Sequence, residues 1–572
     1  MSRGLPTARI LVIEAGPAAP DDLGINVPGR KGSTLGTRLD WNFTTVPQEG
    51  LRGRVVGANR GKVLGGSSAL NLLCWDRAAT VEYDAWADAG NRGWDWEAMQ
   101  AAMLRSEQYV GGPPGSGTAG PVRALVNRVV PAHQAAWIPT LDRAFGIPEN
   151  KDSLNGNPIG ASLQPSSIDP AHYNRSYSTN AYLPLAGRNL DVLTDTLVSQ
   201  VLLRGSGSKG SEMIATGVLL ANGTTVSARR EVILSAGTFQ SPLLLELSGI
   251  GQPGLLTSAN ITPVVPLPGV GENLADHVRV QASYLLPSGA TSFDILRHNT
   301  SYAAAELAKW LAGDASLYDY TASGFLFANW AQVLGPDGAA RLRDRAAAEL
   351  AGSTHPADRA KLLHLADRRV PQLEVIFSDG YTGVKGYPAP GTPLYGRNFF
   401  TLIAGLMHPL ARGSVHLNAS TVRGRGGGAA AVAKPVIDPR YGASAYDVAA
   451  LVEAAKFLRR LALAPPLRQA WEAEYEPGPE AVGGGAGDDE WRAFVRNTTL
   501  SIFHPTGTCS MLPRADGGVV DARLVVYGTR NLRVVDASVV PVQISAHIQT
   551  AVYGIAERAA EIIVREAERR AC

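Results

Sequence analysis

Cysteine is scarce in this chain. Only Cys74, Cys509 and Cys572 occur among its 572 residues. Three thiols so far apart exclude a disulfide framework and a cysteine-based zinc site. Each is therefore expected to be a buried or incidental thiol.

The chain also has no long apolar run and little net charge. No stretch approaches the roughly 18 apolar residues that cross a bilayer, and the N-terminus lacks the apolar core of a signal peptide. The net charge is +2, with Lys and Arg scattered along the chain. A membrane span is not expected, and nothing in the charge predicts nucleic acid as a partner.

A glycine turn that could bind a phosphate is missing as well. Two GxGxxG strings occur, at Gly115–Gly120 and Gly205–Gly210. The first runs directly into Pro121, and the second leads into a strand-like segment. Because neither opens a helix, neither can direct backbone N–H groups and a helix dipole at a phosphate. Both strings are interpreted as chance matches.

The composition that remains is that of an ordinary globular protein. Hydrophobic residues make up 45% and charged residues 18%, which excludes a disordered chain. The length exceeds what one hydrophobic core holds, so two or more domains are expected. Early in the chain, ILVIEAG predicts a buried strand that ends at Glu14. A carboxylate in that place could bind ribose hydroxyls, but by itself it is more often simply solvated.

The segment 59–71, NRGKVLGGSSALN, is the first one with a ligand-binding character. Gly65 and Gly66 would let the backbone approach a flat ligand closely, and Ser67 and Ser68 offer hydroxyl donors beside it. A tight turn followed by a helix N-cap at Ser67 or Ser68 explains the same letters equally well.

Several long motifs together resemble the glucose–methanol–choline (GMC) oxidoreductase family. GKVLGGSSALN resembles its first signature, and GTFQSPLLLELSGIG, which spans Gly237–Gly251, resembles its second. GVGENLADH, which spans Gly269–His277, resembles a further family segment. The resemblance covers nearly the whole chain and implies FAD as cofactor. The cofactor-binding residues that it implies are Glu14, Gly65, Gly66, Ser67, Asn71, Val198, Asp536, Ala537, Gln549 and Thr550.

Two histidines near the C-terminus carry the predicted chemistry. Oxidation of an alcohol needs a hydride acceptor and a base with a pKa near working pH, which favours neutral imidazole. His504 and His547 are 43 residues apart, the separation that the resemblance assigns to the two active-site histidines. It implies His504 as the catalytic base and His547 as the residue that binds the substrate oxygen.

The other histidines receive no such support. With ten in the chain, any one of them is more often structural than catalytic, and His277, His408 and His416 are interpreted as structural. No metal site is expected, because the candidate histidines lack the short spacings that bring ligands together.

The substrate is predicted from one aromatic residue. Phe503 directly precedes the base and resembles the pocket residue of aryl-alcohol oxidases in this family, which indicates a primary alcohol, with an aromatic one as an option. Oxygen or a quinone-like compound would accept the electrons. Two alternatives stay open: a non-redox lyase of the hydroxynitrile-lyase type on the same fold, and an inactive remnant without flavin.

The resemblance also implies the fold. We expect a mixed α/β protein with a discontinuous, Rossmann-like FAD-binding domain and a substrate domain built from helices and an antiparallel sheet. The expected FAD-binding domain comprises residues 1–155, 189–280 and 501–572, and the substrate domain residues 156–188 and 281–500.

The predicted FAD-binding domain is N-terminally incomplete. In the family, a strand, the glycine turn and a helix precede the equivalent of ILVIEAG, whereas only thirteen residues precede Glu14 here. A lost natural start is favoured over a degenerate protein, and with a lost leader peptide the protein would be secreted. Secretion would suit the Asn-x-Ser/Thr sequons at Asn42, Asn174, Asn222, Asn260, Asn299, Asn418 and Asn497.

Overall fold

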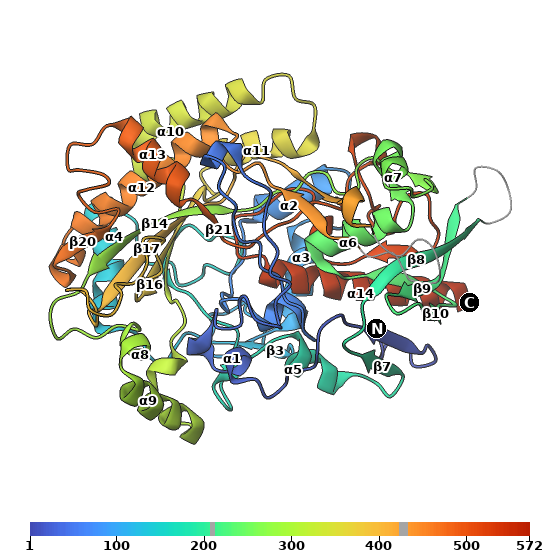
Figure 1. Cartoon of the computed structure of the whole chain (residues 1–572), viewed down its shortest axis with the longest axis horizontal. Coiled ribbons are helices and arrows are strands. Elements are labelled where there is room, and N and C mark those ends of the chain that lie inside the picture. Colours follow the sequence, from blue (N-terminus) through green and yellow to red (C-terminus); the bar gives the residue numbers. More distant parts are fainter. Residues whose placement is uncertain (206–211, 423–432, 572) are drawn as a thin grey trace.

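The computed structural model of the protein describes residues 1–205, 212–422 and 433–571. Figure 1 shows a large sheet around β14, β16 and β17 at one side of the molecule and the strands β8, β9 and β10 at the opposite side. Most of the Gly205–Gly210 string lies outside the described residues. The Gly115–Gly120 string lies in the loop between two short strands and opens no helix, as expected.

A seven-stranded antiparallel sheet forms one side of the molecule, called the substrate side because most of its strands fall in the predicted substrate domain. Its strands run in the order β20, β14, β17, β16, β15, β4, and β21 pairs with β14. Their bounds are β20 Ala473–Glu476, β14 Val278–Leu285, β17 Phe399–Leu406, β16 Leu373–Asp379, β15 Gly324–Ala328, β4 Gly160–Leu163 and β21 Leu500–Ser501. Both faces of the central strands are buried, and FFTLIAGL of β17 is accordingly a nearly continuous apolar run, whereas LEVIFSD of β16 includes buried polar residues.

Alternation along these strands separates the two faces of the sheet. In β15, Leu326 packs in the core with α12 (Ala445–Leu463), whereas Phe325 and Phe327 join a smaller cluster on the other face. Because side chains alternate along a strand, Glu374 of β16 lies on the same face as Ile376, a member of that smaller cluster. One face therefore packs in the core, and the other face carries Glu374 and the smaller apolar cluster.

The nucleotide side combines short parallel pairs with an antiparallel meander. β1 (Ile10–Ile13) pairs in parallel with β7 (Leu190–Leu193), and β11 (Val232–Leu234) with β22 (Leu532–Val534). The meander consists of β8 Val198–Gly205, β9 Met213–Leu220 and β10 Thr225–Ser227. The mixed α/β fold expected from the sequence is confirmed.

One local expectation is wrong. β1 forms where ILVIEAG predicts a strand, but the strand is not buried, because Leu11 is 43% exposed. Among the described residues β1 pairs only with β7, so the two-stranded sheet leaves much of its surface in contact with solvent.

Helices pack the two sides together. α14 (Gln549–Ala571) crosses the nucleotide side against α3 (Trp96–Ser106), as Figure 1 shows. The other helices of six or more residues are α2 Thr80–Asp88, α4 Trp137–Phe145, α6 Gly237–Leu247, α7 Pro253–Ser258, α9 Thr300–Ala312, α10 Trp330–Glu349, α11 Pro356–Ala366 and α13 Asp488–Thr498. No helix in the described ranges is long and apolar enough to cross a membrane.

Candidate active site

Strand pairing brings one predicted histidine to a second one. β21 pairs with β14 so that Ser501 lies opposite Val278, and Ile502 donates its backbone N–H to His277. His277 therefore lies directly before β14, and His504 lies shortly after the end of β21. Their Nδ1 atoms lie 3.0 Å apart, within hydrogen-bond distance. His277, interpreted from the sequence as structural, thus contacts a predicted catalytic residue.

The second predicted histidine arrives from the start of α14. His547 lies two residues before Gln549, the first residue of that helix. The rings of His504 and His547 are 4.6 Å apart between centroids and nearly perpendicular, at 82°. Both side chains are nearly buried. The structure therefore brings together the two histidines that the sequence predicts as a pair.

Two buried carboxylates lie beside His547. Its Nδ1 lies 2.7 Å from Asp76 Oδ2 and 3.3 Å from Glu374 Oε1. Both carboxylates are fully buried. Within the described residues, Asp76 Oδ1 and both oxygens of Glu374 have no hydrogen-bond partner. Two buried acidic groups therefore face His547 on this side of the site.

The backbone around His504 is fixed by a different carboxylate. Asp276 Oδ1 accepts from the His504 backbone N–H at 2.8 Å, and Asp276 Oδ2 accepts from Ser501 Oγ at 2.6 Å. Phe503 has a φ of 66°, a left-handed conformation that is unusual for an aromatic residue. Its carbonyl accepts from Arg60 Nη1 at 3.0 Å. These bonds hold the strained turn that aims His504.

The two imidazoles have opposite pKa shifts. Burial, followed by the proximity of His547, His277 and Arg60, lowers the pKa of His504 well below its ordinary value. Burial also lowers the pKa of His547, but Cys74, Glu374 and Asp76 together raise it well above its ordinary value. Burial raises the pKa of Glu374 to about 7, and His547 moderates that rise. These shifts favour a neutral His504 and a cationic His547.

The Gly65–Gly66 turn lies next to α14. Gly65 and Gly66 have φ values of 104° and 54°, and a Cβ added to Gly66 would meet no heavy atom within 4 Å. A short 3-10 helix begins at Gly66, and its N-cap, Gly65, makes no side-chain bond. The alternative of a serine N-cap is therefore wrong. Asn71 Nδ2 donates to Gln549 Oε1, so the turn is joined to the start of α14.

The other predicted cofactor residues lie at strand ends and helix starts. Glu14 follows β1, and its Oε1 accepts from Gly16 N at 2.7 Å. Val198 begins β8. Asp536 accepts from Gly237 N and Ser241 Oγ of α6, and it caps the short helix that starts at Ala537. Thr550 Oγ1 donates to the carbonyl oxygen of Asp76. Their roles in cofactor binding stay predictions.

Comparison with known proteins decides the family. Two profiles described as GMC oxidoreductase match residues 22–279 and 409–556. The chain belongs to the GMC oxidoreductase family. A GMC oxidoreductase family protein of Malassezia sympodialis is 35% identical over 97% of this chain and 88% of its own length. Pyranose dehydrogenase 3 of Leucoagaricus meleagris is 30% identical over 98% of this chain and 89% of its own.

Solved structures give the same answer for the whole chain. An FAD-dependent oxidoreductase from Chaetomium thermophilum aligns with a TM-score of 0.82 and 26% identity, covering 98% of this chain and 96% of that one. A fungal aryl-alcohol oxidase aligns with a TM-score of 0.79 and 27% identity, covering 99% and 96%. This GMC oxidoreductase is therefore an FAD-dependent enzyme.

The residues present fit FAD in three places. Glu14 lies at the carboxyl end of a parallel strand, where such folds bind ribose. The open side of Gly66 leaves room for a flat ring, and the buried Gln549 Nε2 has no hydrogen-bond partner within the described residues. The N-terminus of the 23-residue α14 also favours a partial negative charge at this end.

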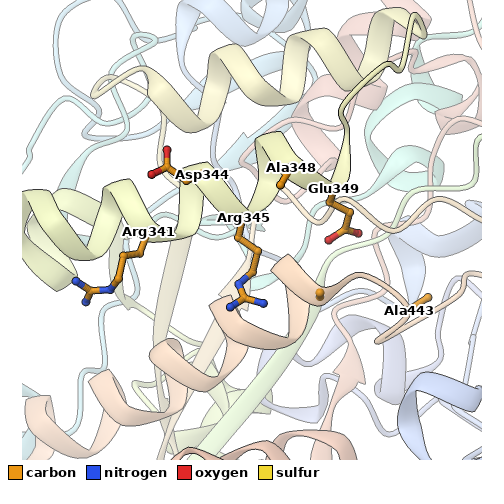
Figure 2. Close-up of a pocket in the computed structure, with 7 residues that line it drawn as sticks. Arg341, Asp344, Arg345, Ala348, Glu349 and Ala443 are labelled. Carbon is orange, nitrogen blue, oxygen red and sulfur yellow. The ribbon is translucent and has the colours of Figure 1, made fainter.

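A surface hollow elsewhere has a different character. Figure 2 shows it between α10 and the start of α12, with Arg341, Arg345 and Glu349 along its wall. None of the predicted catalytic or cofactor residues lines it. The histidine pair, and not this hollow, is the candidate active site.

Sequence reasoning missed three residues of the site. Glu374 is a charged residue inside the apolar run PQLEVIFS, and that contrast is a signal for a buried functional carboxylate. His277 closes the GVGENLADH motif, so its place in a family segment offered a second signal. Asp76 has no comparable signal, because only the fold brings it to His547.

Proposed function

We propose that this GMC oxidoreductase oxidises a primary alcohol to the aldehyde, with aromatic alcohols as the favoured class. The observation that supports this is the contact between a neutral histidine and a cationic one in a buried site. Removal of a hydroxyl proton needs a base, and the oxygen that loses it needs a donor. A neutral and a protonated imidazole supply these two functions.

His504 acts as the base in this proposal. With its Nδ1–H donated to His277 Nδ1, its Nε2 keeps a lone pair for the substrate hydroxyl. Burial lowers the pKa of His277 well below its ordinary value, so His277 is neutral and can accept. The proposal therefore requires His277 to be protonated at Nε2 and His504 at Nδ1.

His547 acts as the donor to the substrate oxygen. Its Nδ1 is bound by Asp76, which leaves Nε2–H for the developing alkoxide. The hydroxyl proton goes to His504, and the carbon-bound hydrogen leaves with its electron pair. FAD supplies the acceptor for that hydride when it is bound, and oxygen or a quinone takes the electrons afterwards.

The apolar cluster beside His547 supports an aromatic substrate. Phe325 packs edge-on against the His547 ring, with centroids 5.8 Å apart. Phe325 belongs to a cluster with Phe327, Ile376, Ile403 and Met407. Phe503, the aromatic expected from the sequence, makes no ring contact with either histidine in the described part of the chain. Phe325 is therefore the better candidate for contact with an aromatic ring.

Anaerobic flavin reduction tests the proposal. The enzyme with FAD bound is mixed with a benzylic alcohol, a straight-chain primary alcohol and a sugar, and bleaching of the flavin is followed. We expect the fastest bleaching with the benzylic alcohol and aldehyde as the product. Aldehyde release from a cyanohydrin without bleaching would support the lyase alternative, and absence of bound flavin after FAD addition would support the inactive one.

A further inference from the structure

A second group of buried ligand-type side chains lies apart from the histidine pair. Glu82 comes from α2, His364 from α11, and His408 from the segment that follows β17. One ligand atom from each side chain lies within 4.8 Å of the others. His408 Nε2 is 3.1 Å from Glu82 Oε1, and the two imidazole centroids are 5.0 Å apart.

Ring nitrogens in this group have no hydrogen-bond partner. Both nitrogens of His408 and Nδ1 of His364 are buried without a partner in the described residues. His408 is 0% and His364 3% exposed. A buried polar atom left without a partner is destabilising. Because a neutral imidazole carries one lone pair, His364 and His408 can each offer one nitrogen to a shared ligand beside the Glu82 carboxylate.

Both imidazoles lie buried beside one carboxylate. Neutral imidazole is the metal-binding form of histidine. Glu82 Oε1 accepts one backbone N–H, from Ser545, and so keeps a lone pair for a metal ion.

We propose that Glu82, His364 and His408 bind a zinc ion. Ligand atoms about 2.0–2.2 Å from a tetrahedral zinc lie about 3.3 Å from one another, close to the 3.1 Å between His408 Nε2 and Glu82 Oε1. Two imidazoles and one carboxylate suit zinc better than calcium or magnesium, which prefer oxygen ligands. Water completes the fourth position.

Lys361 is a buried cation that interacts with both histidines of this group. It lies one helical turn before His364, and its Nζ donates to the carbonyl oxygen of Pro409. Burial lowers the pKa of Lys361 to about 8. Its ammonium can therefore lose a proton at small cost when a second cation binds nearby.

The zinc would join parts of the chain that are far apart in sequence. Glu82 also accepts from the Ser545 backbone N–H at 2.6 Å, and Ser545 lies two residues before His547. An ion at Glu82 would therefore link α2, α11 and the segment after β17 behind the turn that carries His547. The expected role is structural, since the site lies outside the pair that we assign to catalysis.

Metal content tests the assignment. The FAD-loaded enzyme is produced in medium that contains zinc and is dialysed against a weak chelator, and its zinc content per chain is then measured. The variants His364→Gln and His408→Gln and the exposed control His172→Gln are treated in the same way. We expect about one zinc per chain in the wild type and the control and less than about a tenth of that in the two variants. Zinc-free wild type would overturn the proposal, and so would zinc retained in both variants.

A second measurement uses the wild type alone, in case the variants do not fold. Apo-enzyme titrated with Co²⁺ should develop the visible absorption of a tetrahedral cobalt site, with an end point at about one ion per chain. Anomalous diffraction at the zinc edge should place the ion between Glu82, His364 and His408. Absence of the cobalt bands, or an ion located elsewhere, would contradict the assignment.

Discussion

His504 and His547 lie in contact, but their Nδ1 atoms have different partners. The Nδ1 of His504 lies 3.0 Å from another imidazole, whereas the Nδ1 of His547 lies 2.7 Å from a carboxylate. Burial disfavours the charged form of both rings, and only His547 has anions near enough to reverse that effect. The two imidazoles therefore differ in their favoured protonation state because their Nδ1 atoms face different partners, His277 and Asp76. Four substitutions test this difference.

The largest effect is expected from loss of the base. In His504→Gln, flavin reduction by a benzylic alcohol should slow by about 100- to 10,000-fold, because no other group takes the hydroxyl proton. Stopped-flow absorbance under anaerobic conditions measures this rate of flavin reduction. The flavin spectrum should stay as in the wild type, and a wild-type rate of bleaching would refute the base assignment.

Loss of the cationic donor comes next. In His547→Asn, the same rate should fall by about 100- to 1,000-fold, the usual range for removal of an oxyanion donor. Asp76 and Glu374 lose their positive partner in this variant. A companion variant, His547→Asn with Asp76→Asn, should therefore recover thermal stability but not the rate; recovery of the rate would contradict the donor role.

A moderate effect on pH dependence is expected from Asp76→Asn. Removal of this anion lowers the pKa of His547, so the cation is lost earlier as pH rises. The alkaline limb of kcat/KM should move to lower pH by about one unit or more, while the acidic limb, set by the low pKa of His504, stays in place. A shift of the acidic limb alone would show that the two assignments are reversed.

The same ion pair should affect stability with a definite sign. Because the pKa of His547 is raised on folding, the stabilisation is fully present below its unfolded pKa of about 6.5 and is lost as pH rises through the folded pKa. Thermal unfolding across pH should show a smaller alkaline loss in Asp76→Asn than in the wild type.

The smallest effect is expected from His277→Asn. Loss of one orienting hydrogen bond should slow flavin reduction by about fivefold, equivalent to about 1 kcal/mol. The exposed His172→Asn serves as a control and should leave the rate unchanged. A loss as large as that of His504→Gln would show that His277 itself takes the proton.

Prediction from sequence worked best where a motif and its spacing carry the chemistry. The sequence predicts His504 and His547 as a pair, and the structure places their rings 4.6 Å apart. It also predicts the segment that holds Gly65, Gly66 and Asn71, and Asn71 bonds to Gln549 at the start of α14. Burial of β1 was predicted wrongly, because an apolar run reports the preference of the residues and not whether a neighbouring layer covers them.

Local motifs of fixed spacing in the sequence encode the family, the FAD dependence and the pairing of His504 with His547. The sequence does not show which of these histidines is favoured as neutral and which as cationic. That difference depends on Asp76 and Glu374, which lie far from His547 in the sequence and reach it through the fold. A pKa is set by distance in space, and a linear sequence does not contain those distances.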